Sequence, residues 1–154
     1  MQKKYRPNAA VLITDGNGRV LLCERLEPVR QVQTVQGGID PGETAREAAV
    51  RELWEEVGLT PDQFDLVGEV PGTFRYDWPE EYRAQLKDPG AYDGQEQTVF
   101  LAKTHPDVVF DLETHNKEFS RVWWGTPEEM IEKSWSAKRS ILEAALRHFA
   151  LLSE

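Results

Sequence analysis

The sequence is poor in cysteine and methionine and contains no long apolar stretch among its 154 residues. Its single cysteine, Cys23, excludes an internal disulfide, and the apolar run at residues 20–22 before it favours a buried core position over a nucleophile. No segment approaches the roughly 18 apolar residues of a spanning helix, and the first residues lack the apolar part of a secretory signal. We therefore expect a cytoplasmic protein that does not associate with membranes.

Positive charge is also scarce, with 18 Lys and Arg residues against 27 Asp and Glu residues and a net charge of −9. This balance argues against broad electrostatic binding of nucleic acid, which needs a basic surface. An anionic substrate would have to be admitted by a metal ion and a few local cations. The length and the 40% hydrophobic content predict one domain over residues 1–154, and no pattern indicates a stable protein partner.

Strand-like and helix-like segments alternate along the chain, which predicts an α+β fold with a mixed sheet between helices. A hairpin is expected at residues 9–24, further strands at 66–70, 97–101 and 121–124, and helices from residues 45, 127 and 136. The segment 77–95 fits no regular element, and it is either a lid over a site or a long loop with its own irregular packing.

The helix that starts near residue 45 has clear signals at both ends. Thr44 and Glu47 form a capping box, and Gly58 can take the left-handed conformation that ends a helix. Apolar residues recur every fourth position and predict a buried stripe of Ala49, Leu53 and Val57. The face that carries Glu52, Glu55 and Glu56 is therefore left to point into a cleft.

Three carboxylates share that face. At about 100° per residue, Glu55 lies about 60° from Glu52 on one side and Glu56 about 40° on the other. Their mutual repulsion raises their pKa values unless a positive charge lies among them. A hard divalent cation that prefers oxygen ligands, Mg²⁺ with Mn²⁺ as a substitute, meets that need.

The same segment follows the spacing G-x5-E-x7-R-E-U-x-E-E-x-G-U, where U is apolar. The fixed positions are Gly37, Glu43, Arg51, Glu52, Leu53, Glu55, Glu56, Gly58 and Leu59. Residues 37–59 thus resemble the box of the Nudix hydrolase superfamily. The resemblance implies an α/β/α sandwich, metal ligation by Glu52 and the Gly37 carbonyl, and a supporting pair between Arg51 and Glu43. Glu55 and Glu56 are expected to be further metal ligands and catalytic residues.

A narrower resemblance extends from residue 5 to about 149. It is carried by Tyr5-Arg6-Pro7-Asn8, Gln36-Gly37-Gly38, Arg75-Tyr76, Gly94-Gln95, Glu118-Phe119 and Lys138-Arg139. These motifs are similar to those of the bacterial RNA 5′-pyrophosphohydrolase and dinucleoside-tetraphosphate hydrolase branch. By this likeness Glu118 is a further metal ligand or the general base, unless it is merely an exposed residue at a strand end.

The likeness also implies contacts to phosphate or nucleobase. The candidates are Arg6, Gln36, Arg75, Tyr76, Gln95 and Lys138. Arg6 and Lys138 can equally be surface cations, and Tyr76 can simply pack. The sequence also departs from the branch: residues 32–35 lack the W-x-x-P pattern before Gln36, and Glu96 stands where the branch has lysine. An acidic residue there disfavours a long polyanion.

The sequence therefore predicts Mg²⁺-dependent hydrolysis of a phosphoanhydride in a nucleoside polyphosphate by a metal-activated water. The expected substrates are RNA 5′-triphosphate ends, from which pyrophosphate is released, or dinucleoside tetraphosphates. Hydrolysis of a nucleotide sugar, ADP-ribose or a (d)NTP is the alternative within the same chemistry. A nucleotide-sensing module without turnover is the alternative outside it, because a fold does not dictate an activity.

Overall fold

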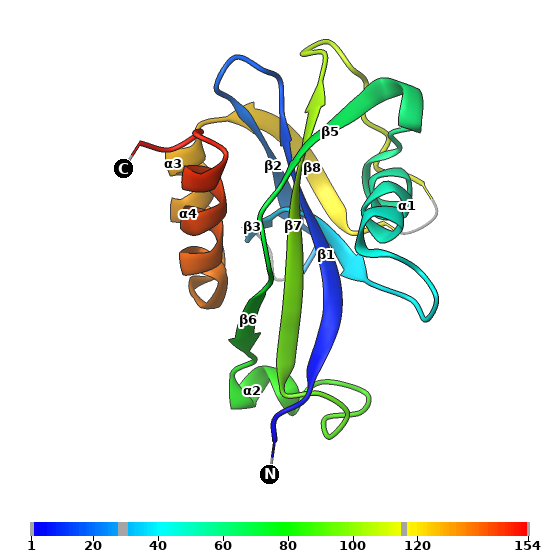
Figure 1. The fold of residues 1–154 in the computed structure, drawn as a ribbon, viewed down its shortest axis with the longest axis vertical. Helices are drawn as coiled ribbons and strands as arrows, with labels where there is room; N and C mark the ends of the chain where they lie inside the picture. Colours follow the sequence, from blue (N-terminus) through cyan, green and yellow to red (C-terminus); the bar gives the residue numbers. More distant parts are fainter. Residues whose placement is uncertain (1, 28–30, 115–116, 154) are drawn as a thin grey trace.

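The computed structural model describes residues 2–27, 31–114 and 117–153. One mixed sheet of eight strands lies between helix α1 on one face and helices α3 and α4 on the other (Figure 1). This arrangement confirms the predicted α+β class and the α/β/α sandwich. Among the helices of the described residues, none combines the length and apolar character needed to cross a membrane.

The sheet is built around strands β1 and β7, which pair in parallel along ten residues of β1. Its strands are β1 Tyr5–Thr14, β2 Val20–Arg25, β3 Val32–Gln33, β4 Val35–Gly38, β5 Phe64–Glu69, β6 Phe74–Asp77, β7 Gly94–Thr104 and β8 Phe119–Gly125. The central order is β3-β2-β1-β7-β5, with β4 paired to β1, β6 to β7 and β8 to β2, all antiparallel. The predicted hairpin and the three further predicted strands are present, whereas β3, β4 and β6 were not predicted.

The helices are α1 Ala45–Val57, α2 Glu80–Arg83, α3 Pro127–Lys133 and α4 Arg139–His148, with short 3-10 turns η1 Pro61–Gln63 and η2 Ser136–Lys138. The prediction that Ser136 caps the last helix is wrong, because Ser136 begins η2 and α4 starts at Arg139 after Lys138. Glu80–Arg83 gives one helical turn to the segment 77–95, and β7 begins inside that segment at Gly94. Its role as a lid stays a prediction.

Helix α1 forms as its end signals predict. Thr44 Oγ1 accepts from the Glu47 amide at 3.1 Å, and the Glu47 carboxylate accepts from the Thr44 amide at 2.9 Å. At the other end Gly58 has a φ of 72°. The predicted stripe of Ala49, Leu53 and Val57 is fully buried against the sheet. Burial of this stripe places Glu52 and Glu56, which lie beside it on the helix, against strand β4.

Candidate active site

Glu52 and Glu56 on α1 are both buried, with 5% and 3% of their surface exposed, and both line one cavity. They lie one helical turn apart, so their carboxylates stack along the same face. Glu55 is half-buried and does not line that cavity. Two of the three predicted carboxylates of the helix are therefore brought together in the wall, and the third lies beside it.

Strand β4 meets this face at very short range. A Cβ atom built on Gly37 would lie 2.0 Å from the Glu52 Oε1 atom, so no larger residue fits at this position unless the carboxylate moves. The next contact is made by the Gln36 amide, which donates to Glu56 Oε1 at 3.1 Å. Close backbone approach thus fixes both carboxylates from the sheet side and explains the glycine that the sequence motif requires.

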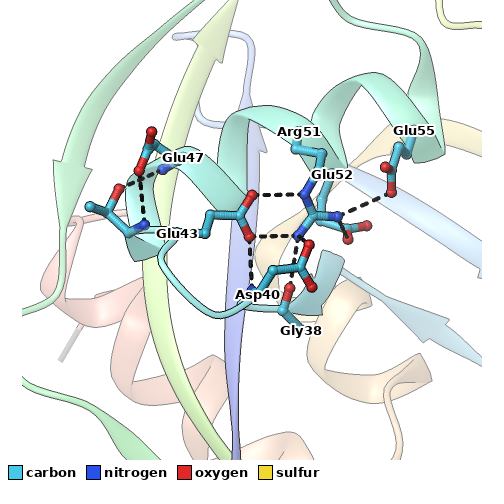
Figure 2. A network of polar contacts seen from close by, with 8 residues as sticks. Gly38, Asp40, Glu43, Glu47, Arg51, Glu52 and Glu55 are labelled. Carbon is cyan, nitrogen blue, oxygen red and sulfur yellow. Dashed lines mark hydrogen bonds and ion pairs between the residues drawn. The ribbon is translucent and has the colours of Figure 1, made fainter.

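Arg51 holds the network on the other side of Glu52 (Figure 2). Its Nε and Nη2 atoms each donate at 2.9 Å to a different oxygen of Glu43. Its Nη1 atom donates to Glu52 Oε1 at 2.7 Å and to Glu55 Oε2 at 3.3 Å, and Nη2 also reaches the Gly38 carbonyl at 2.8 Å. The planar guanidinium therefore ties the loop before α1 to its acidic face.

Glu43 carries its charge easily in this network. The hydrogen bonds from Arg51 and from the Asp40 amide lower the pKa of Glu43 to about 2. Glu43 thus stays ionised at neutral pH and keeps Arg51 in place. Neither residue lines the cavity, so both act on it through Glu52. The Arg51–Glu43 pair implied by the Nudix resemblance is present in this geometry.

Burial has the opposite effect on the cavity carboxylates. It is the largest cause that raises the pKa of Glu56 to about 9, and the charges of Glu52 and Glu118 add to the rise. Burial also raises the pKa of Glu52, although the hydrogen bond from Arg51 opposes that rise. Two buried carboxylates of this kind need either protons or a cation between them.

The cavity at this face has a volume of about 260 Å³. It brings together nine of the predicted site residues: Gly37, Glu52, Glu56, Glu118, Arg6, Gln36, Tyr76, Gln95 and Lys138. These residues come from α1, from strands β1, β4, β6 and β7, from η2 and from the residue before β8. The cavity therefore lies where most of the elements meet at one end of the sheet.

Arg75 is not brought to this cavity. Its side chain is 63% exposed, pairs with Glu96 Oε2 at 2.6 Å and lies 5.0 Å above the Tyr5 ring. The structure gives its predicted contact to substrate no support. The same pair neutralises Glu96, the acidic residue that the sequence placed near the substrate, so that its predicted repulsion of a polyanion is weakened.

The described part of the chain does not contain a complete set of metal ligands in one place. No three His, Cys, Asp or Glu side chains there are grouped closely enough to hold one ion. The donor chemistry nevertheless fits a divalent cation, because Glu52 and Glu56 each use one oxygen on a protein donor and keep the other. One or two carboxylates, completed by waters and substrate phosphates, are the usual protein share of a Mg²⁺ site.

The part of the cavity lining that does not come from α1 carries Lys138, which is 9% exposed. Its Nζ atom donates to Gln36 Oε1 at 2.8 Å and lies 5.4 Å from the centre of the Tyr76 ring. Burial lowers the pKa of Lys138 to about 7, helped by the charge of Arg25 and opposed by Glu56. The Tyr76 hydroxyl in turn donates to Gln95 Oε1 at 2.5 Å. Cations and amides in this part of the lining suit the oxygens of a polyphosphate.

Several cavity residues escaped the sequence prediction. They are Asn8, Arg25, Gln33, Gly38, Trp78, Tyr82 and Trp135. Tyr82 and Trp135 lie 5.5 Å apart between ring centres and separate the cavity from an adjoining groove of about 480 Å³, to which Arg25 also contributes. Tyr82 and Trp135 lie 53 positions apart, so no spacing rule relates them. Asn8 and Gly38 stand in motifs that carried the family resemblance, which was the usable signal for these two residues.

Comparisons with known proteins agree with this geometry. An RNA pyrophosphohydrolase of Erythrobacter litoralis is 40% identical over 153 residues, covering 97% of this chain and 93% of that protein. An RNA pyrophosphohydrolase of Nitratiruptor sp. is 32% identical over 152 residues, covering 96% of this chain and 95% of that protein.

Solved structures show the same fold at low identity. The E. coli dihydroneopterin triphosphate pyrophosphohydrolase matches with a TM-score of 0.75 at 20% identity, over 95% of this chain and 99% of that chain. A C. elegans Ap4A hydrolase binary complex matches with a TM-score of 0.68 at 20% identity, over 96% and 99%. The family model of the NUDIX domain matches residues 4–145. The chain belongs to the Nudix family.

Proposed function

We propose that this protein is a Mg²⁺-dependent pyrophosphohydrolase that removes pyrophosphate from the 5′-triphosphate end of RNA. The observation that carries the proposal is the cavity itself, whose lining combines the buried carboxylates Glu52 and Glu56 with the buried Lys138. The similarity of nearly the whole chain to proteins named RNA pyrophosphohydrolase supports this choice of substrate. The proposal places the protein in the cytoplasm, where such RNA ends arise.

Glu52, Glu56 and the Gly37 carbonyl are the proposed ligands of Mg²⁺, for which Mn²⁺ is a substitute. When bound, the cation lowers the pKa of a coordinated water and neutralises charge that develops on the phosphates. The protein residues keep the ligands in position: Arg51 holds one oxygen of Glu52, and the Gln36 amide holds one oxygen of Glu56. Held side chains lose little freedom when the ion binds.

Glu118 is the proposed third carboxylate, which serves as a further ligand or accepts the proton of the attacking water. It lines the cavity just before β8, and its carbonyl accepts from the Leu26 amide at 3.1 Å. This backbone bond anchors its position while leaving its carboxylate without a hydrogen bond to the described residues. A Glu118→Gln variant separates the two roles, because loss of a base lowers kcat at saturating Mg²⁺ whereas loss of a ligand raises the Mg²⁺ requirement.

The cavity residues Lys138, Arg6, Gln36, Tyr76 and Gln95 form what we call the donor wall, which is the proposed binding surface for phosphates and the first base. Lys138, Arg6 and Gln36 supply donors to phosphate oxygens, and Tyr76 with Gln95 lies where the nucleoside would enter. Arg6 lies against β4, since a Cβ atom on Gly38 would be 2.5 Å from its Nη2 atom. A few placed donors of this kind admit a polyanion to a protein whose net charge is −9.

Dinucleoside tetraphosphate hydrolysis is the second candidate, and the groove next to the cavity favours it. The groove of about 480 Å³ opens across Tyr82 and Trp135, which gives room and aromatic surface for a second nucleoside. An RNA chain can use the same space for its second nucleotide. The site geometry therefore allows both substrates, and the products must distinguish them.

The deciding experiment is a product analysis with triphosphorylated RNA and diadenosine tetraphosphate side by side, with and without Mg²⁺. Release of pyrophosphate from RNA at the higher kcat/KM supports the main proposal, and faster cleavage of diadenosine tetraphosphate supports the second candidate. Preferred turnover of a nucleotide sugar, ADP-ribose or a (d)NTP in the same panel would overturn both. Saturable binding without metal-dependent product would identify a nucleotide sensor.

A further inference from the structure

Four polar side chains form a hydrogen-bonded row along the cavity, and three of them, Asn8, Gln36 and Lys138, line it. Lys138 Nζ donates to Gln36 Oε1 at 2.8 Å, Gln97 Nε2 donates to the same oxygen at 3.1 Å, and Gln97 Nε2 also donates to Asn8 Oδ1 at 3.0 Å. Asn8 and Gln97 are 1% and 2% exposed and lie opposite each other on β1 and β7. Buried amides are costly unless paired, so this row is a built feature.

The row has a fixed direction. A lysine ammonium has three donors and no acceptor, so the Gln36 atom that faces Lys138 is its oxygen. That oxygen also receives Gln97, which must therefore present its NH₂ group, and the second hydrogen of this group goes to the Asn8 oxygen. The NH₂ groups of Gln36 and Asn8 are left without a hydrogen bond to any described residue, and both residues line the cavity.

We infer that Gln97 is a positioning residue that, with Lys138, orients the Gln36 side-chain amide so that its NH₂ group donates to the polyphosphate in the cavity. Ionised phosphate oxygens only accept hydrogen bonds, so an amide turned the other way would repel them. The inference rests on the proposed function for the identity of the ligand. Gln36 also holds Glu56 through its backbone amide. One residue thus joins the acidic wall, formed by Glu52 and Glu56, to the donor wall.

Two substitutions reverse the donor by different routes. Gln36→Glu keeps an oxygen for Lys138 and Gln97 but presents an acceptor to the cavity in place of the NH₂ group. Gln97→Glu replaces the donor of the row by a carboxylate next to the oxygen that Lys138 now contacts. We expect Lys138 to pair with this carboxylate, so that the amides of Gln36 and Asn8 are free to turn their NH₂ groups inward to it. Gln33→Glu is the matched control, because Gln33 lines the same cavity and receives the same charge without a hydrogen bond to the row.

Binding is measured first with inorganic tripolyphosphate and Mg²⁺, which requires no turnover. We expect Gln36→Glu and Gln97→Glu to weaken binding at least about tenfold more than Gln33→Glu does, in line with the loss of a hydrogen bond to a charged group. With a nucleotide substrate the same variants should raise KM and leave kcat within about threefold. Binding equal to that of Gln33→Glu in both variants would overturn the inference.

A spectroscopic measurement covers the case in which either variant folds poorly. In the wild-type protein, the side-chain NH₂ resonances of Gln36 should shift when tripolyphosphate and Mg²⁺ are added, whereas those of Gln97 should stay protected from solvent exchange. An unmoved Gln36 signal in a protein that binds tripolyphosphate would overturn the inference. Failure to hydrolyse any nucleotide, with the Gln36 shift present, would instead overturn the proposed function and leave this assignment standing.

Discussion

The two walls of the cavity are built in opposite ways. The acidic wall has both carboxylates on one helix, where Glu52 and Glu56 lie four residues apart and Glu52 is held by Arg51 from the same helix. The donor wall is assembled from β1, β4, β6, β7 and η2, with Arg6 and Lys138 separated by more than 130 positions. The acidic wall is thus a local structure, whereas the donor wall exists only once the whole sheet and α4 have packed.

This difference assigns different duties to the walls. Residues that hold a catalytic ion must keep their geometry in every turnover, and a single helix with a guanidinium clamp keeps it well. Residues that bind different substrates can come from separate elements, because the position of each residue can then change together with its own strand or turn. Substitutions in the acidic wall should therefore affect the chemical step, and substitutions in the donor wall should affect which ligand binds and how tightly.

The largest effect is expected for Glu52→Gln. It removes a charge that the proposed Mg²⁺ site needs and should lower kcat/KM by about 10²–10³-fold, the range for loss of one electrostatic stabiliser of a transition state. The measurement is Mg²⁺-dependent release of product from the preferred nucleotide. Full activity in this variant would contradict the metal site on α1.

Glu55→Gln is the matched comparison on the same helix. Glu55 lies outside the cavity lining and contacts Arg51 at 3.3 Å, so its loss should cost less than about tenfold. Equal losses in Glu52→Gln and Glu55→Gln would show that the ligand set shifts along the helix when the ion binds.

The next effect concerns Arg51→Lys. A lysine has one donor group in place of the planar fork, so it cannot bridge Glu43 and Glu52 as the guanidinium does. We expect the Mg²⁺ concentration for half-maximal activity to rise about 10–100-fold, with kcat largely recovered at saturating Mg²⁺. A Mg²⁺ titration measures this, with Arg46→Lys on the exposed side of α1 as control. A loss of kcat that Mg²⁺ does not restore would contradict a positioning role.

The acidic wall could be predicted from the sequence more fully than the donor wall, because its carboxylates lie on one helix. The α1 helix, its caps and its buried stripe follow from spacings of three and four residues, and all were confirmed. The short strands β3 and β4 carry too few residues to show a period of two, so the strand that brings Gly37 against Glu52 was not predicted. Gly37 was placed at the site only through the Nudix resemblance.

The donor wall was predicted by resemblance to a family, and its contacts are tertiary. Lys138 is buried because η2 turns it toward Gln36, which no local pattern indicates. Arg75 is paired with Glu96 in the register of β6 and β7, one position from the Tyr76–Gln95 pair that lines the cavity. Its side chain points away from the cavity because neighbouring strand residues face opposite sides of a sheet. Prediction of this wall needs the pairing of β7 with β1 and β6, which depends on the complete fold.

A smaller effect is expected for Lys138→Met, which should weaken substrate binding and at the same time stabilise the fold. Loss of the cation should raise KM for the nucleotide about tenfold, because a hydrogen bond from a charged group to phosphate is lost. The same change should raise Tm by about 2–4 °C, because a buried ammonium no longer has to be desolvated. Kinetics and thermal unfolding of one preparation test both. A fall in Tm together with unchanged KM would assign Lys138 to stability and remove it from the donor wall.

The smallest effect is the pH dependence of the metal-free protein. The pKa of Glu56 is raised from its usual 4.5 to about 9 in the folded state, so the folded protein holds this proton more tightly than the unfolded chain does. Its contribution to stability is therefore full below pH 4.5 and is lost as the pH rises toward 9. Lys138, with a folded pKa of about 7, makes the protein more stable as the pH rises above that value. The effect of Glu56 is therefore best measured between about pH 5 and 6.5.

In that window, Tm of the metal-free wild-type protein should fall with rising pH more steeply than Tm of Glu56→Gln, in which the titrating group is absent. The glutamine keeps an oxygen for the Gln36 amide, so the comparison changes charge and little else. Added Mg²⁺ should reduce the difference between the two proteins, because the cation replaces the proton between the carboxylates of the wild type. Parallel pH profiles would mean that the acidic wall is already relaxed or hydrated without metal, and that its close contacts with β4 form only around the ion.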